Sequence, residues 1–133
     1  MEIIDLTSFK NAKTRLHEIL VRYKNDNYDP DIRDAVVKRF EYTYSLALKM
    51  IYRYLKYAAP ENDYIPDFNE AIRQANQRGL LLTDLEQWSE YRLKRNMSSH
   101  TYDDEVANDI VSVMDKFVKD VDFLFEELEK RLW

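Results

Sequence analysis

Apolar residues recur at every third or fourth position along most of this chain, which is the spacing of one face of an α-helix. The pattern predicts a first helix over residues 6–24 and a second over about residues 30–58. Asp29 and Pro30 support the second start, because Asp is a good N-cap and Pro fits the first helical position. The apolar seam of the second helix is formed by Ile32, Val36, Phe40, Tyr44, Ala47, Ile51 and Leu55.

The rest of the chain predicts two shorter helices and one long helix. After a loop, Asp67 is placed to cap a short helix that stops at Gly79. Thr83 is placed to cap the next helix, and a last long helix is predicted from about residue 102 to residue 132. Together these helices predict an all-α fold, an up-and-down antiparallel bundle of four to five helices in a single domain over residues 1–133.

Turn-forming residues are scarce, which favours long helices over sandwiches, barrels and propellers. The sequence holds one Gly and three Pro, so it has no glycine-rich phosphate-binding loop. It has no Cys, which excludes disulfides, thiolate zinc sites and cysteine nucleophiles. Its two isolated His give too few ligands for a zinc site. A carboxylate-only magnesium site stays open, because the chain has 25 Asp and Glu, but no acidic pair stands out. We therefore predict no metal and no cofactor.

The chain is acidic and polar overall, with a net charge of −5, a pI of about 5.1 and a mean hydropathy of −0.62. No apolar run approaches the ~20 residues of a membrane span, and the segment 1–5 lacks the basic and apolar regions of a signal peptide. We therefore expect a cytoplasmic protein without membrane contact. Because nucleic-acid-binding domains are usually basic, any contact with RNA needs a local basic patch or a partner.

Two groups of side chains on the second helix have both a structural and a functional interpretation. Its tyrosines suit either the edge of the core or a helix–helix dimer surface. Its cations suit either a solvated face or a strip that meets phosphate. The tyrosines are Tyr42, Tyr44, Tyr52, Tyr54 and Tyr57, and the cations are Lys38, Arg39, Lys49, Arg53 and Lys56. On the first helix, His17 is expected at the surface or at the edge of the core.

One segment, residues 91–103, gathers chemically active side chains at a predicted helix break. Hydroxyl residues there are weak in helix interiors and good as caps, so a helix should end near residue 97 and another should start near residues 101–103. Arg95 and His100 are five apart and would not share a face of an unbroken helix. A break lets both point into one pocket, with Asn96 close to His100.

Arg95 and His100 together suit metal-free cleavage of RNA. A guanidinium binds phosphate, and an imidazole exchanges protons near neutral pH. In such cleavage the ribose 2′-hydroxyl attacks the adjacent phosphate, with a base, an acid and a cation assisting. One chain offers one suitable His, and a two-fold dimer would supply two. The other interpretation is a capped interhelical junction, with Arg95 paired to Asp103 or Glu105.

The same segment resembles the R-x-x-x-x-H-x-Y motif of the HEPN superfamily of small all-helical proteins. The string that carries the resemblance is Arg95-Asn96-Met97-Ser98-Ser99-His100-Thr101-Tyr102. The polar residue after the Arg is also typical of the motif. Residues 39–41, 68–72 and 99–103 are similar to the branch known as nucleotidyltransferase substrate-binding proteins. The resemblance extends over nearly the whole chain in length, helix order and motif position.

The resemblance implies a helical bundle that forms a homodimer with its motif facing the dimer cleft. Members usually act with a separate minimal nucleotidyltransferase. Many are metal-independent ribonuclease toxins that this partner silences by transferring AMP to the motif Tyr. Carried over, these roles make Arg95 and His100 catalytic with the support of Asn96, and make Tyr102 the AMP acceptor. The remaining candidates, for contacts to phosphate, RNA or nucleotide, are Arg92, Lys94 and Ser99.

Three hypotheses therefore stand after the sequence. The first is an endoribonuclease toxin that acts on tRNA or mRNA in a two-gene module with a minimal nucleotidyltransferase. The second is a non-catalytic subunit that binds a nucleotide or substrate for that nucleotidyltransferase. The third is a structural bundle that mediates interactions only, in which Arg95 and His100 are dispensable.

Overall fold

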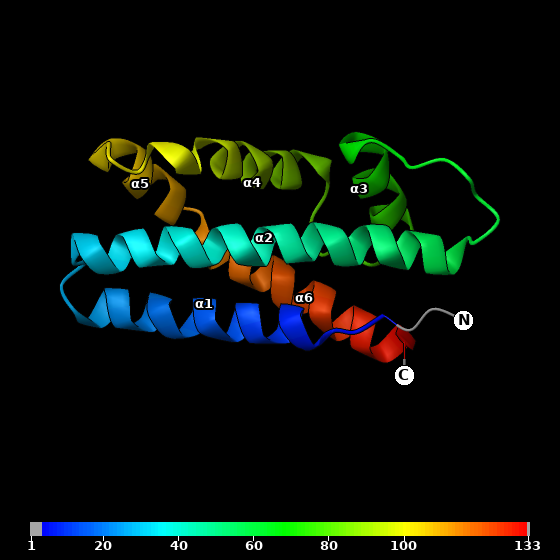
Figure 1. Ribbon diagram of the computed structural model, residues 1–133, viewed down its shortest axis with the longest axis horizontal. Helices are drawn as coiled ribbons and strands as arrows, with labels where there is room; N and C mark the ends of the chain where they lie inside the picture. The colour runs from blue at the N-terminus through cyan, green and yellow to red at the C-terminus, as the bar shows by residue number, and fades with distance from the viewer. Residues whose placement is uncertain (1–3, 133) are drawn as a thin grey trace.

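The computed structural model describes residues 4–132 and confirms an all-helical bundle (Figure 1). Residues 1–3 and 133 lie outside the described part, including most of the segment that was compared with signal peptides. The described residues form six α-helices and one 3₁₀ helix, η1. These are α1 Thr7–Asn25, α2 Pro30–Ala58, α3 Phe68–Gln77, α4 Leu85–Met97, η1 Ser98–His100, α5 Asp104–Val111 and α6 Met114–Leu132.

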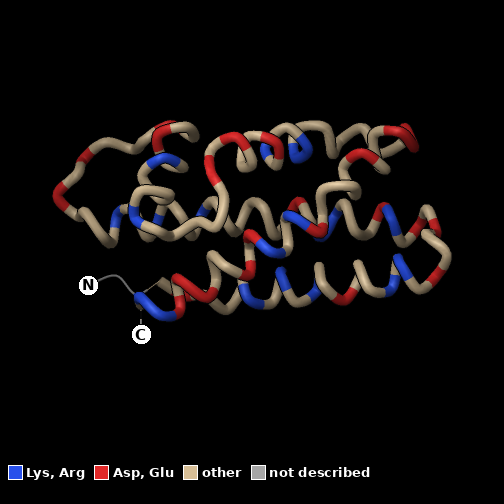
Figure 2. Tube along the Cα trace, turned by 180° about the vertical axis from the view of Figure 1, so that it is seen from behind, with Lys and Arg blue, Asp and Glu red and all other residues tan. Residues whose placement is uncertain are grey.

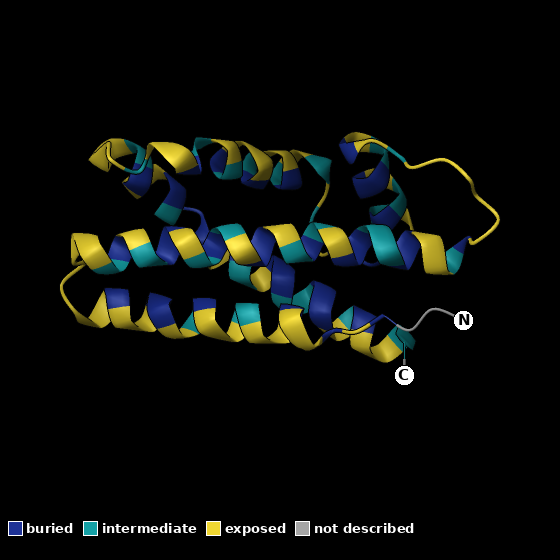
Figure 3. Cartoon of the chain, in the orientation of Figure 1, coloured by how far each residue is buried: buried dark blue, intermediate teal, exposed yellow. Residues whose placement is uncertain are grey.

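The two long helices α1 and α2 run antiparallel along the length of the molecule (Figure 1). Helices α3, α4 and α5 lie along the opposite side of α2, and α6 crosses behind α1 and α2. Buried residues line the facing sides of the helices, and exposed residues line the outer sides (Figure 3). Helix α2 therefore forms the central element of the bundle, and it packs against both layers.

Aromatic side chains from α2, α4 and α6 meet at the centre of the core. The rings of Phe40 and Phe117 lie edge to face at 4.8 Å between centroids, and those of Tyr91 and Phe117 at 5.0 Å. All three residues are fully buried. Each such burial stabilises the fold by about 1.5–3 kcal/mol, so this cluster fixes α4 against the α2–α6 pair.

Most predicted helix ends are confirmed, because their signals are local. The Asp29 carboxylate accepts hydrogen bonds from the backbone N–H groups of Asp31 at 2.8 Å and Ile32 at 3.3 Å. Asp67 caps α3 by accepting from the Glu70 N–H at 2.9 Å. Gly79 follows α3 with φ of +72°, a left-handed conformation that favours Gly after a helix.

Two details of the predicted helices are wrong. The last helix is not continuous, because α5 ends at Val111 and α6 begins at Met114. The Ser112 hydroxyl donates to the Asp109 carbonyl oxygen at 2.5 Å, a local bond that competes with the helical ladder. The cap of α4 is Asp84 rather than Thr83. The Thr83 hydroxyl instead donates to the buried Asp120 carboxylate at 2.8 Å.

The tyrosines of α2 differ in burial. Tyr44 and Tyr54 are buried, Tyr52 is half-buried, and Tyr42 and Tyr57 are exposed.

Acidic and basic residues are mixed along the bundle (Figure 2), although the charged residues of α1 are mostly basic. Within residues 4–132, no helix is long and apolar enough to cross a membrane.

Candidate functional site

The motif lies where α4 gives way to η1 and then to α5, which confirms the predicted helix break. Arg95 and Asn96 lie in the last turn of α4, His100 ends η1, and Tyr102 lies in the turn that precedes α5. Asp103 caps α5 by accepting from the Glu105 N–H at 2.9 Å. Negative charge at this end also complements the partial positive charge of a helix N-terminus.

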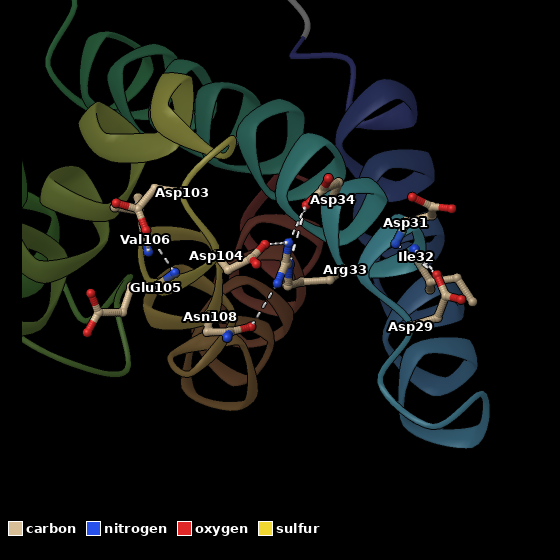
Figure 4. A network of polar contacts seen from close by, with 10 residues as sticks. All are labelled: Asp29, Asp31, Ile32, Arg33, Asp34, Asp103, Asp104, Glu105, Val106 and Asn108. Atoms are coloured by element: carbon tan, nitrogen blue, oxygen red, sulfur yellow. Dashed lines mark hydrogen bonds and ion pairs between the residues drawn. The ribbon is translucent and has the colours of Figure 1, made fainter.

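Two ion pairs hold α5 in place on either side of the motif. Arg33 on α2 donates through Nη2 to the Asp104 carboxylate at 2.8 Å and through Nη1 to the Asn108 side-chain oxygen at 3.3 Å (Figure 4). Lys94 on α4 donates to the Asp109 carboxylate at 2.7 Å. Helix α5 is therefore tied to both α2 and α4.

The electrostatics of Arg33 favour its charged form. Its side chain is only 7% exposed, and this burial by itself would lower the pKa of the guanidinium. The hydrogen bonds to Asp104 and Asp34 act more strongly together and raise that pKa above its ordinary value. Arg33 is therefore a permanent charge that is held by carboxylates from two helices.

Arg95 is half-buried and bonds within its own turn. Its Nη1 donates to the Ser98 hydroxyl oxygen at 3.2 Å, and that hydroxyl donates to the Arg95 carbonyl oxygen at 2.7 Å. Within residues 4–132, no ion pair joins Arg95 to Asp103 or Glu105, the pairing that the junction interpretation expects. The fork of the guanidinium is thus not neutralised by a carboxylate.

His100 and Tyr102 lie side by side at the surface. Tyr102 is 85% exposed, and its hydroxyl lies 3.4 Å from His100 Nδ1, with the two rings edge to face. Asn96 and Ser99 are also exposed. No hydrogen bond in the described part of the chain joins the Arg95 and His100 side chains. The structure therefore places both side chains at one helix break without a hydrogen bond between them.

The other predicted cations differ in their availability. Lys94 is buried, and Asp109 already neutralises its ammonium. Arg92 is exposed along α4, and its guanidinium lies over the Phe68 ring at 4.7 Å from the centroid. Arg92 and Arg95 are three residues apart on α4, so they project from neighbouring positions on one face. These two guanidinium groups are the cations of this region that carry no carboxylate partner among the described residues.

Tyr44 lies on α2, which packs against α4. The sequence predicted Tyr44 in the apolar seam and among the tyrosines of the core edge or a dimer surface, but not at the site. Burial raises the pKa of its hydroxyl to about 12, and the nearby charges of Arg92 and Arg95 act in the opposite direction. The hydroxyl oxygen is buried and has no hydrogen-bond partner within residues 4–132. The sequence could have indicated this residue, because a Tyr at a buried seam position must bury its hydroxyl, whereas an apolar residue there would not.

Other features of the molecule lie apart from the motif. His17 is a half-buried edge residue, as predicted, and its Nε2 lies 3.0 Å from the Asp122 carboxylate.

A cavity of about 1060 Å³ lies under the loop after α2. It is lined mainly by apolar and Tyr side chains and contains none of the predicted site residues. Its Lys56 ammonium is bound by the carbonyl oxygens of Pro60 and Asn62. The described residues hold no cluster of three or more potential metal ligands.

The arrangement at the helix break can bind an anion and exchange protons. The Arg95 guanidinium has no carboxylate partner among the described residues, and its fork suits two phosphate oxygens. The exposed imidazole of His100 can accept a proton from a bound group or donate one to it. The exposed phenol of Tyr102 can be reached by a modifying enzyme. One chain provides a single imidazole here, so an acid and a base cannot both come from His in one copy.

Comparisons with known proteins identify the family of this chain. Residues 4–130 match the family model described as nucleotidyltransferase substrate binding protein like. A relative named probable ribonuclease HepT, from Haemophilus influenzae, is 38% identical over 99 residues, which cover 73% of this chain and 67% of the relative.

The fold is also similar to that of a solved protein from the same organism. That structure is described as revealing the fold of a substrate binding domain of a nucleotidyltransferase. It has a TM-score of 0.87 and 29% sequence identity, and the likeness covers 94% of this chain and 99% of the other. The family match extends over nearly the whole chain, and the chain therefore belongs to the nucleotidyltransferase substrate-binding-protein-like family, a HEPN-type family.

Proposed function

We propose that this chain is a metal-independent endoribonuclease that acts as the toxin of a two-gene module in the cytoplasm, with a minimal nucleotidyltransferase as its partner and antitoxin. The observation that carries the proposal is that a guanidinium without a carboxylate partner, Arg95, and an exposed imidazole, His100, lie at one helix break. The name of the Haemophilus relative, a probable ribonuclease, supports it.

In this reaction the ribose 2′-oxygen forms a bond to the adjacent phosphorus while the bond from phosphorus to the 5′-oxygen breaks. A base takes the proton of the 2′-hydroxyl, and an acid gives a proton to the departing 5′-oxygen. Arg95 stabilises the charge that grows on the phosphate oxygens, and Asn96 supports the pair. A homodimer that apposes two copies of the motif provides one His100 as base and another as acid.

The partner would silence the enzyme by transferring AMP from ATP to Tyr102. The Tyr102 oxygen forms a bond to the α-phosphorus, its proton leaves to solvent, and pyrophosphate departs. The exposure of this phenol and its 3.4 Å separation from His100 Nδ1 support the proposal. The product would place a bulky anion over the imidazole and near the Arg95 guanidinium.

The deciding experiment incubates protein from cells that lack the partner with tRNA and a model mRNA in EDTA. We expect the wild type to cleave RNA, and His100→Ala and Arg95→Ala to lose cleavage by at least about 100-fold. His17→Ala is the matched control, because it removes the other His of the chain and should cleave like the wild type. The nuclease function would be refuted if the RNA stays intact with a wild-type sample whose mass shows that Tyr102 is unmodified.

The modification is tested separately by adding a minimal nucleotidyltransferase and ATP. We expect the mass of the wild type to increase by one AMP and its cleavage to stop. Tyr102→Phe should take up no AMP, whereas Tyr42→Phe, which removes another exposed phenol, should be modified normally. Modification of Tyr102→Phe would contradict the assignment of the acceptor.

A second candidate function is a non-catalytic subunit that presents a nucleotide or substrate to the nucleotidyltransferase. The description of the solved Haemophilus relative as a substrate-binding domain favours it. Exposed Arg92 and Ser99 would then contact the phosphate of the nucleotide. This function predicts binding of the partner or a nucleotide while RNA stays intact with every variant.

A further inference from the structure

The hydroxyl of Tyr44 is a buried polar group without a partner. The residue is only 4% exposed, and no hydrogen bond reaches its oxygen within residues 4–132. The other buried Tyr hydroxyls of α2 and α4 have partners: Tyr54 accepts from Arg131 at 3.1 Å, and Tyr91 donates to Asp120. An unpaired buried hydroxyl destabilises a fold. Phe would fill the same space without this cost, so the oxygen at this position requires an explanation.

The neighbours of the hydroxyl identify what it can bond. Arg92 and Arg95 lie on α4, which packs against α2, and both charges lower the pKa of this hydroxyl against the effect of burial. A guanidinium only donates hydrogen bonds, and a phenol oxygen can accept them. In the free protein Arg95 donates to Ser98 and Arg92 lies over Phe68. The Tyr44 oxygen is therefore an acceptor beside donors that are bound elsewhere in this state.

We propose that Tyr44 is a positioning residue of the RNA-cleaving site, acting through Arg95. When an RNA phosphate draws the Arg95 guanidinium away from Ser98, one N–H turns to the Tyr44 oxygen and the remaining N–H groups hold the phosphate. This inference rests on the proposed nuclease function. In this role the Tyr44 hydroxyl fixes the orientation of the Arg95 guanidinium.

The burial of the hydroxyl determines that its role is indirect. Its oxygen has almost no exposed surface in the free protein, so RNA cannot reach it in this state. A residue that contacted the substrate itself would have to be exposed at the break, as His100 and Tyr102 are. Tyr44 therefore influences cleavage through the geometry of Arg95, and the loss of its oxygen should lower the rate more than the affinity.

The first test compares wild type with Tyr44→Phe, which removes only the oxygen. We measure single-turnover RNA cleavage in EDTA over a range of protein concentrations, together with thermal unfolding. We expect the maximal rate to fall about 10- to 100-fold, the effect of one hydrogen bond to a charged group, while the Tm is unchanged or rises. Tyr54→Phe is the matched control: it loses its bond from Arg131, so its Tm should fall while its rate stays that of the wild type.

The second test asks whether Tyr44 acts through Arg95. In an Arg95→Lys background, which keeps the charge without the fork, Tyr44→Phe should cause little further loss. In an Arg92→Lys background, Tyr44→Phe should lower the cleavage rate by the same factor as it does in the wild type. The proposal would be overturned if the wild type and Tyr44→Phe cleave RNA equally fast. It would also be overturned if the effects of Tyr44→Phe and Arg95→Lys on the rate are fully additive. Neither result would contradict the proposed nuclease function. If the wild type does not cleave RNA, the proposed function fails and this role fails with it.

Discussion

Replacement of Arg33 by Met tests how strongly the clamp between Arg33 on α2 and Asp104 on α5, which lie 71 residues apart in the sequence, stabilises the fold. Arg33 joins α2 to α5 through Asp104 and Asn108 (Figure 4). Met fills most of the space of the aliphatic stem, so the change removes the charged hydrogen bonds and little packing. Arg33→Lys is the matched variant, because it keeps the charge but cannot reach both partners with a planar fork.

The contacts of Arg33 give the size of the effect. A hydrogen bond to a charged group contributes about 1.5–3 kcal/mol when it is well shielded, but exposed pairs contribute only about 0.2–1 kcal/mol. The Arg33 side chain is 7% exposed, whereas Asp104 is 82% exposed and returns to water when its partner is removed. No buried charge is left unpaired, so the large penalty of a broken buried pair does not arise. We expect Arg33→Met to lower the free energy of unfolding by about 1–2 kcal/mol.

Urea unfolding and hydrogen exchange test this estimate. For Arg33→Met we expect a lower urea midpoint with an unchanged slope, and faster exchange of the backbone amides of α5 than of those of α1. Arg33→Lys should lie between Met and wild type. High salt should reduce the difference in urea midpoint between the wild type and Arg33→Met, because Asp104 is exposed. An unchanged midpoint, or a loss above about 4 kcal/mol, would refute this description of the clamp.

Two further changes test other parts of the fold. Gly79→Ala should lower the free energy of unfolding by about 1 kcal/mol in urea melts, because φ of +72° strains any residue with a Cβ; an unchanged midpoint would contradict this. Burial raises the pKa of Asp120 above its ordinary 3.8, so the stability that this group supplies is complete below that value and declines as pH rises through the raised pKa. Asp120→Asn removes this dependence. The free energy of unfolding of the variant should therefore increase relative to that of the wild type between about pH 3 and pH 7. Parallel curves of the two free energies against pH would contradict a raised pKa for Asp120.

The sequence predicts the helices of this protein well where their signals are local. The start of α2 at Asp29 and Pro30, and the left-handed Gly79 after α3, depend on residues within one turn. The break between α5 and α6 is not predicted, because Ile110, Val113 and Met114 continue the helical apolar spacing through it. Only the side chain of Ser112, which bonds back to the helix, marks the interruption.

The site divides in the same way between local and distant determinants. The break at residues 98–103 follows from local capping residues, so the position of His100 and Tyr102 at a helix break could be predicted from the sequence. The bond from Arg33 to Asp104 and the effect of Arg95 on the pKa of Tyr44 depend on how α2 packs against α4 and α5. A charge on a helix has many conceivable partners, and only the tertiary arrangement selects among them.

The clamps also constrain how modification of Tyr102 would silence the proposed nuclease. Helix α5 is tied to α2 by Arg33 and to α4 by Lys94, so the turn that carries Tyr102 leads into a helix that is fixed to two others. Because the Tyr102 phenol is exposed, an adenylyl group on it displaces no buried contact, and we expect the helices to keep their arrangement. Silencing would then act by occupation of the space above His100, and the modified protein should unfold at the same temperature as the unmodified one. A large shift in Tm on modification would instead indicate that α5 moves.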